Sequence, residues 1–177
     1  MESLIDLSAK KLRPFTLIYL KNKEQVLLLK RNRNKEMVPD KWLGLGGKIE
    51  PGEDLFDSAK REFREESGLT LTNLVLRGTF SWIEEKQYAG IAYIFVATEY
   101  QGNLLADCNE GELEWQQISS IDQLADLASH QHFFLQKMLT DDAHFYSGIA
   151  VYNKGNLISY VDNSDFFEER KRINKEI

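Results

Sequence analysis

The sequence predicts an α+β fold in a single domain that spans residues 1–177. A chain of 177 residues is long enough to bury a core and has the usual length of one domain. Runs of β-branched and aromatic residues predict strands along much of the chain, and helical spacing appears in a few segments between them. The apolar share of 42% and the charged share of 28% are typical of a globular protein.

The first predicted strands form a hairpin. Residues 14–20 (PFTLIYL) and residues 25–30 (QVLLLK) are apolar, and a polar turn joins them. A further short strand is expected within residues 42–47 (WLGLGG), where leucines alternate with glycines that let other backbone pack closely.

A helix is predicted over residues 55–67. Asp54 can cap its start, and Gly68 stands where a glycine commonly ends a helix. Phe56, Ala59 and Phe63 recur at helical spacing and predict a stripe that faces the core.

The same helix carries three glutamates on one face. Glu62, Glu65 and Glu66 fall at i, i+3 and i+4, so their carboxylates crowd about one turn. A divalent cation such as Mg²⁺, which prefers oxygen ligands, would relieve their repulsion. The alternative interpretation is a solvated acidic surface.

Two longer strands are predicted after this helix, over residues 71–82 and 88–100. The second is the most continuous run of β-branched and aromatic residues and is expected at the centre of the sheet. Residues 119–127 and 131–139 are expected to form helices.

A C-terminal hairpin is predicted over residues 146–152 and 156–161. The sequence NKGN between them is typical of a tight turn. The charged residues 165–177 that follow are expected to form a frayed helix.

Composition limits the location and the partners of the chain. A net charge of −6 disfavours binding to a nucleic-acid polymer. The longest apolar run, residues 91–97, is too short to span a bilayer, and the N-terminus has no signal-peptide core. The single cysteine, Cys108, cannot form an intrachain disulfide and is consistent with the cytoplasm, where we expect the protein.

Basic and aromatic residues outside the helix have two interpretations each. Arg31, at the end of the second strand, is a candidate clamp for substrate phosphates, and a solvated loop is the alternative. His130 and His132 are expected in a loop or at a pocket rim rather than in a metal site. Phe133 and Phe134 are expected in the core rather than as platforms for a base.

Residues 47–69 resemble the complete Nudix box of the Nudix hydrolases. Apolar Phe63 and Leu69 stand where the box expects bulky residues. The resemblance implies an α/β/α sandwich with a mixed β-sheet and a loop–helix–loop box, to which residues from about 145 to 177 add a C-terminal extension. Every fixed position of the box is filled: Gly47, Glu53, Arg61, Glu62, Glu65, Glu66 and Gly68.

The resemblance also implies a metal-dependent site. Glu62, Glu65 and Glu66 would be the catalytic residues and the ligands of Mg²⁺, with Mn²⁺ as a possible substitute. Gly46 matches the residue whose carbonyl oxygen binds metal in the family. Which glutamate takes the proton from water stays open, because that role varies among family members.

Further residues are expected around these ligands. Glu110, a few residues before Trp115, matches an additional metal carboxylate of MutT-type enzymes, and Glu112 is the alternative. Lys48 matches a lysine found near the substrate phosphates.

Two pairs of residues complete the expected site. Arg61 is predicted to fix Glu53 and the loop through a charge-assisted hydrogen bond, as supporting structure. Related enzymes carry a tryptophan and an acidic residue where this chain has residues 128–132, so Gln131 or His132 is the candidate that reads the base.

The sequences GLGGKIEPGE and CNEGELEW resemble those of MutT-type 8-oxo-dGTP diphosphatases of Gram-positive bacteria. The resemblance implies Mg²⁺-dependent hydrolysis of a nucleoside triphosphate to a monophosphate and pyrophosphate, including removal of oxidised nucleotides, by a monomer or a homodimer. Two alternatives stay open. One is hydrolysis of ADP-ribose, a nucleotide sugar or a dinucleoside polyphosphate, and the other is a non-catalytic domain that senses a ligand.

Overall fold

A mixed sheet of eight strands forms the centre of the structure, a computed structural model that describes residues 12–35, 37–84, 88–106, 108–142 and 144–163. The strand order is β10-β9-β5-β6-β1-β2-β3, and β8 also pairs with β2. The pairs β1–β6 and β5–β9 are parallel, and the other pairs are antiparallel. The strands are β1 (Leu12–Asn22), β2 (Gln25–Arg31), β3 (Trp42–Leu43), β5 (Val75–Glu84), β6 (Tyr88–Ala97), β8 (Gly111–Gln117), β9 (Tyr146–Asn153) and β10 (Asn156–Asp162).

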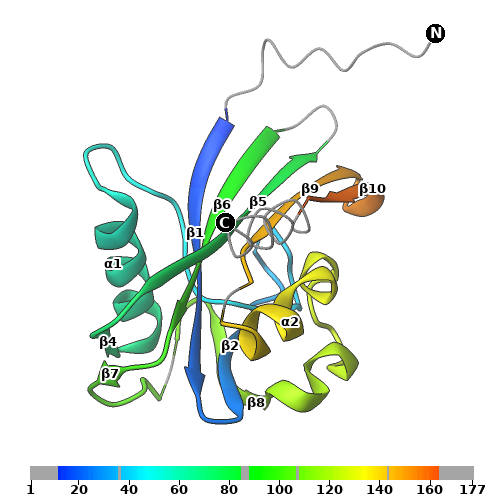
Figure 1. Cartoon of the computed structure of the whole chain (residues 1–177). Helices are drawn as coiled ribbons and strands as arrows, with labels where there is room; N and C mark the ends of the chain where they lie inside the picture. Colours follow the sequence, from blue (N-terminus) through cyan, green and yellow to red (C-terminus); the bar gives the residue numbers. More distant parts are fainter. Residues whose placement is uncertain (1–11, 36, 85–87, 107, 143, 164–177) are drawn as a thin grey trace, which may run out of the picture.

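Helices cover both faces of this sheet, as Figure 1 shows. The helix α1 (Leu55–Ser67) packs on one face, where Ala59 and Phe63 belong to one core cluster. The 3₁₀ helix η1 (Ile118–Gln123) and the helix α2 (Leu135–Thr140) cover the other face and belong to a second cluster. The expected α/β/α sandwich with a mixed sheet is therefore confirmed.

The strand β1 shows why its sequence is apolar throughout. Ile18 and Leu20 belong to the cluster under α1, whereas Leu17 and Tyr19 belong to the cluster under α2. Successive side chains of a strand point to opposite faces, so a strand covered on both faces needs an apolar residue at nearly every position. The same holds for β6, which lies between β1 and β5 near the middle of the sheet, as predicted.

The helix α1 begins and ends where the sequence predicts. The Asp54 carboxylate accepts the backbone N–H groups of Phe56 and Asp57, and Gly68 closes the helix with a left-handed φ of 76°. One expectation about its faces was wrong. Phe56 is 43% exposed, because it lies in the first turn and meets Phe95 only edge-on, with ring centroids 5.2 Å apart.

The strand expected over residues 71–82 is divided in two. Thr70–Leu71 forms β4, which pairs with β7 (Tyr100–Gln101) in a separate two-stranded sheet. The main strand β5 begins only at Val75. Between them the Asn73 side chain accepts the backbone N–H groups of Thr98 and Glu99, which fixes the turn and prevents one continuous strand.

The helix expected over residues 119–127 is a short 3₁₀ helix, and backbone pairing explains its early end. Beyond η1 the chain becomes extended and pairs with β3: Leu127 bridges Trp42, and the Ala128 N–H donates to the Trp42 carbonyl at 2.9 Å. Asp126 accepts the Trp42 N–H at 2.9 Å. These bonds need extended backbone, so the helix cannot continue to residue 127.

The helix expected over residues 131–139 is also interrupted. The 3₁₀ helix η2 (Ser129–Phe133) is followed by α2, and Phe134 separates them with a φ of −140°. Phe133, also expected in the core, is instead 39% exposed and stacks on Tyr160 of β10. Phe134 is buried, as the sequence predicted, with 1% of its surface exposed. Burial of this large ring between the two helices takes precedence over helical continuity.

The C-terminal hairpin is present and extends the main sheet. Its first strand β9 pairs in parallel with β5 over residues 78–84, and β10 forms the sheet edge beyond it. Within the described residues, no helix is both long and apolar enough to cross a membrane. The charged tail predicted over residues 165–177 lies outside the described residues.

Candidate active site

A cleft of about 1210 Å³ reaches from α1 to the C-terminal hairpin. Two parts of its wall differ in chemistry. We call the part lined by Glu62, Glu65, Glu66 and Glu110 the acidic end. The part lined by Phe15, Phe80, Trp82, His130 and Tyr152 is the aromatic end.

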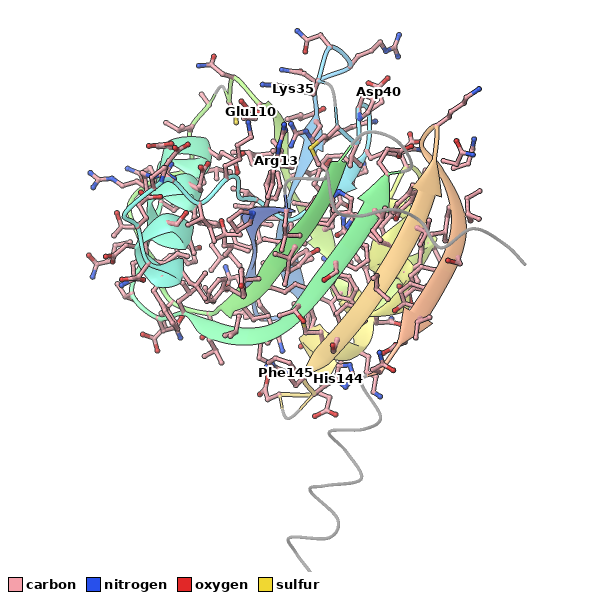
Figure 2. All side chains as sticks on the ribbon, turned by 90° about the horizontal axis from the view of Figure 1, so that it is seen from above. Arg13, Lys35, Asp40, Glu110, His144 and Phe145 are labelled. Atoms are coloured by element: carbon pink, nitrogen blue, oxygen red, sulfur yellow. The ribbon has the colours of Figure 1, made fainter. Side chains whose placement is uncertain are left out.

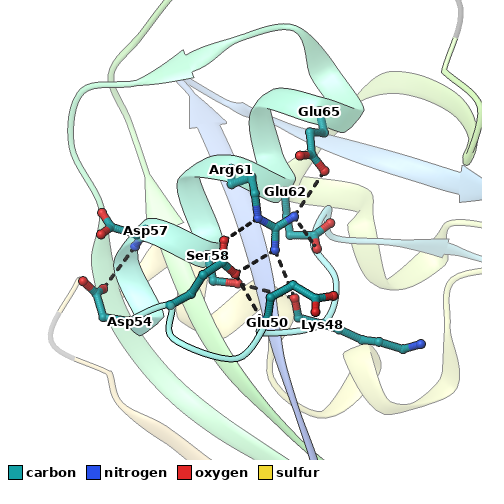
Figure 3. Close-up of polar contacts among 9 residues, drawn as sticks. Lys48, Glu50, Asp54, Asp57, Ser58, Arg61, Glu62 and Glu65 are labelled. Atoms are coloured by element: carbon teal, nitrogen blue, oxygen red, sulfur yellow. Dashed lines mark hydrogen bonds and ion pairs between the residues drawn. The ribbon is translucent and has the colours of Figure 1, made fainter.

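Arg61 organises the carboxylates of the box, as Figure 3 shows. Its guanidinium donates to both oxygens of Glu53, at 2.6 and 2.9 Å, so the expected bond between these two residues is present. It also donates to Glu62 at 2.9 Å and to Glu65 at 3.2 Å. These bonds lower the pKa of Glu53 to about 2 and raise the pKa of Arg61, because each residue stabilises the charged form of the other.

Glu66 is the most buried carboxylate of the acidic end, with 6% of its surface exposed. Its Oε2 accepts the backbone N–H of Gly46 at 2.8 Å. Burial raises its pKa to about 8, and the charges of Glu62 and Glu110 act in the same direction. A carboxylate in this environment is stabilised by a positive partner.

Two glycines let the loop pass close to other groups. Gly46 has a φ of 137°, and a Cβ there would collide with the Thr16 carbonyl. A Cβ on Gly47 would lie 2.5 Å from Oε2 of Glu62. Because Gly47 has no side chain, Glu62 can lie against the loop, where burial raises the pKa of its carboxyl group.

The acidic end fits a hard divalent cation by its donor chemistry. Glu62, Glu65 and Glu66 and the backbone of Gly46 supply only oxygen ligands, the type that Mg²⁺ and Mn²⁺ prefer. Among the described residues, no three histidine, cysteine, aspartate or glutamate side chains already converge on one point. Glu62 and Glu65 instead turn to Arg61, so binding a cation requires them to exchange that partner.

Cationic side chains hold Glu110 beside this group. Lys35 contacts Glu110 at 2.7 Å, a pair visible in Figure 2, and Arg31 approaches it at 3.7 Å. Arg31 lines the cleft, as expected of a phosphate clamp, and within the described part of the chain its buried Nε has no hydrogen-bond partner. Glu112 is exposed on β8 and does not line the cleft, so Glu110 is the better placed of the two candidates.

Lys48 also lines the cleft, with its side chain exposed. Its carbonyl oxygen accepts a hydrogen bond from Arg61 at 3.2 Å, which ties the loop to α1. Figure 3 shows the Lys48 side chain extending away from Arg61. The ammonium group is therefore available to an anionic ligand.

The expectation that Gln131 reads a base is corrected by the structure. Gln131 is completely buried and does not line the cleft. Its Oε1 accepts the Tyr19 hydroxyl at 2.9 Å, and its Nε2 donates to the Trp42 carbonyl at 3.0 Å. Both ends of the Gln131 side-chain amide thus form hydrogen bonds within the core, and neither is available to a ligand. His132, the other candidate, does not line the cleft either.

Sequence reasoning missed the aromatic end, apart from the expectation that His130 lies at a pocket rim. The rings of Phe80 and His130 stack with centroids 4.7 Å apart, and Trp82 lies 5.3 Å from Phe15. Trp82 lies over Gly90 on β6, where any Cβ would collide with the indole. Phe80 and Trp82 alternate on one face of β5, but periodicity cannot tell a face that lines a cleft from a face inside the core.

The hairpin contributes to this end of the cleft. Tyr152, Lys154 and Gly155 line it, together with Glu84 at the end of β5. Burial raises the pKa of Tyr152, and the charge of Glu84 acts in the same direction. The predicted extension therefore forms part of the cleft wall.

Comparison with known proteins agrees with this geometry. The model of the NUDIX domain family matches residues 11–139. The "uncharacterized Nudix hydrolase YvcI" of Bacillus subtilis is 34% identical over 109 residues, which are 59% of this chain and 66% of that relative. The chain thus spans less than the whole length of this relative.

Two further relatives match over more of their length. The oxidized purine nucleoside triphosphate hydrolase of Mus musculus is 30% identical over 129 residues, 72% of this chain and 80% of the relative. The mutator MutT protein of Bacillus halodurans is similar in structure, with a TM-score of 0.76 and 30% identity over 85% of this chain and 97% of that protein. The chain therefore belongs to the Nudix family of hydrolases, and its structural neighbours include MutT proteins.

Proposed function

We propose that the protein hydrolyses a nucleoside triphosphate to a nucleoside monophosphate and pyrophosphate in a Mg²⁺-dependent reaction. The observation that carries this proposal is the composition of one continuous cleft. Its acidic end offers a cluster of carboxylates, among them the buried Glu66, and nearby cationic side chains, which suit a metal–polyphosphate group. Its aromatic end offers rings that suit a nucleobase.

The phosphates would be held by residues around the acidic end. The buried Nε of Arg31 is an N–H donor, and Lys48 lines the same cleft. Both can form charge-assisted hydrogen bonds to phosphate oxygens. Arg31 and Lys35 would then move from Glu110 to the substrate, which would free Glu110 to act as a ligand.

Glu62, Glu65, Glu66, Glu110 and the Gly46 carbonyl would hold the Mg²⁺ ion. When bound, this ion would neutralise phosphate charge and lower the pKa of a water molecule. A carboxylate of the set would take the proton of the attacking water. Glu53 and Arg61 would keep α1 and its loop in place for this step.

A purine triphosphate, including oxidised forms, is the substrate class that we favour. The mouse relative is named as an oxidized purine nucleoside triphosphate hydrolase, and the aromatic end is lined by several rings. Stacking on aromatic rings is strong for any base and does not by itself select one.

A nucleotide panel tests this function. The chain is incubated with Mg²⁺ and dGTP, 8-oxo-dGTP, dATP, ADP-ribose or a dinucleoside polyphosphate, and the products are separated. We expect pyrophosphate from the triphosphates, and a loss of about 100-fold or more in kcat for Glu62→Gln with an unchanged circular dichroism spectrum. Glu114→Gln, on the exposed side of β8, is the matched control and should keep its activity.

Three results would contradict the proposal. Release of AMP from ADP-ribose alone would identify a hydrolase of another diphosphate. Tight nucleotide binding without any hydrolysis would identify a sensor domain. Full activity of Glu62→Gln would move the reaction away from the acidic end.

A further inference from the structure

A carboxylate outside the acidic end also lines the cleft. Glu84 is the last residue of β5 and is 8% exposed. It follows Phe80 and Trp82 at alternate positions, so the three side chains lie on the same face of the strand. All three line the cleft, and the charge of Glu84 is therefore located at the aromatic end.

The hairpin fixes this carboxylate in the cleft wall. Glu84 pairs with Tyr152 in the parallel register between β5 and β9. The backbone N–H of Gly155 approaches Oε2 of Glu84 at 3.4 Å. Lys154 and Gly155 form the tip of the turn with positive φ values of 50° and 77°, which directs that N–H toward β5. An anionic acceptor is thus placed beside the rings on which a base would stack.

The chemistry of a carboxylate limits which base edge it can bind. An ionised carboxylate offers acceptors only, and its two oxygens match two adjacent N–H donors. Guanine presents such a pair at N1 and at its 2-amino group. Adenine presents one donor, the 6-amino group, beside the acceptor N1, so one carboxylate oxygen would face a lone pair.

We propose that Glu84 selects the base of the substrate and favours guanine-type bases, including oxidised ones, which carry two adjacent N–H donors. This inference rests on the proposed function and adds the base class to it. Glu84 acts on specificity and takes no part in the hydrolysis at the acidic end. The residue comes from β5, outside the segment of residues 128–132 where the sequence predicted a base reader.

The substitution Glu84→Gln tests this selection directly. The amide keeps the shape of the side chain but offers one acceptor and one donor, which complements the edge of adenine. For the natural chain we expect kcat/KM to be higher for dGTP than for dATP by about tenfold or more. We expect the same difference between dGTP and dITP, which lacks the 2-amino group. In Glu84→Gln this preference should disappear or reverse, through KM rather than kcat, and dATP turnover should be kept or increased.

Two further variants control for indirect effects. Glu114→Gln removes the same charge from exposed β8 and should leave the base preference unchanged. Glu84→Asp keeps both acceptor oxygens but withdraws them by one methylene, and it should weaken dGTP turnover several-fold without affecting dATP. An equal loss for both nucleotides in Glu84→Asp would indicate a structural role and overturn the inference, even if Glu84→Gln did not fold.

Binding of monophosphates separates this inference from the proposed function. Calorimetry without metal measures the affinity of each variant for dGMP, dIMP and dAMP. If no triphosphate is hydrolysed but the preference for dGMP depends on Glu84, then the proposed function fails and the base selection stands. If dGMP binds the natural chain no better than dAMP, or if Glu84→Gln keeps the preference, the selection by Glu84 is refuted whatever the hydrolysis assay gives.

Discussion

At the scale of single residues, His130 is both stacked on an aromatic ring of the cleft and withdrawn from solvent. Its ring stacks on Phe80 at the aromatic end of the cleft, with the planes inclined by only 10°. Burial lowers its pKa to about 4, and the neighbouring charge of His132 acts in the same direction. The folded protein therefore holds this imidazole neutral at a pH where an unfolded chain would begin to protonate it.

This residue gives a prediction for stability against pH. Between about pH 6.5 and pH 4 the unfolded chain binds a proton at His130 that the folded chain does not bind. The free energy of unfolding should therefore fall through this window as pH falls, by on the order of 2 kcal/mol from this group, and the loss should level off below pH 4. Urea unfolding at several pH values measures it.

His130→Phe is the matched variant for this measurement. Phenylalanine keeps an aromatic ring against Phe80 but cannot take up a proton. The difference in unfolding free energy between the two chains should change through the window and stay constant above pH 7. Parallel curves for the two chains would show that His130 does not cause the loss.

At the scale of elements, α1 and its loop act as one unit because Arg61 joins them. Its bonds reach Glu53 and the Lys48 carbonyl in the loop and two glutamates on the helix itself. The same guanidinium therefore positions the loop and holds Glu62 and Glu65, two of the ligands that we propose for Mg²⁺. A lysine could not form all of these hydrogen bonds, because it lacks the planar guanidinium group with its several N–H donors.

A double-mutant cycle tests this unit. Arg61→Lys and Glu53→Gln should each lower kcat/KM about tenfold or more, because each releases the loop. The double variant should be no worse than the poorer single variant, since both substitutions break the same contact. Independent effects that multiply in the double variant would contradict a shared role. Thermal unfolding of each variant checks that the fold is kept.

At the scale of the whole molecule, the C-terminal hairpin is part of the sheet rather than an appendage. Tyr146 and Ala150 on β9 are completely buried in the cluster that also contains Phe134. Without β9, the edge of β5 and this cluster would be open to water. The family match ends before the hairpin, yet the hairpin also lines the cleft.

Removing the hairpin should therefore abolish the fold. A chain that ends at residue 141 should lose cooperative thermal unfolding and bind a hydrophobic dye, because it loses a paired strand and part of a core cluster. Ile158→Ser is the control, since Ile158 is 60% exposed on β10 and its replacement should leave the melting temperature nearly unchanged. A cooperative transition of the shortened chain would show that the hairpin is dispensable.

The sequence predicted the features that depend on local pattern. Asp54 and Gly68 mark the ends of α1 by their own backbone chemistry, and the spacing of Glu62 and Glu66 places both on one helical face. The sequence could not predict features that depend on residues distant along the chain. The helix near residue 127 ends because of Trp42, and Gln131 is internal because Tyr19 and Trp42 bind it. The aromatic end depends on the pairing of β5 with β9, which no local pattern encodes.

The parallel pairing of β5 with β9 also has a consequence for how the chain is made. Residues 78–84 pair on one side with the nearby strand β6, but on the other side they pair with residues 146–152. This second edge of β5 therefore stays unpaired until residues 146–152 have left the ribosome. Contacts so distant in sequence form slowly, and an uncovered apolar edge can pair with other chains in the meantime. Synthesis of this protein therefore passes through an interval in which protection by a chaperone would matter most.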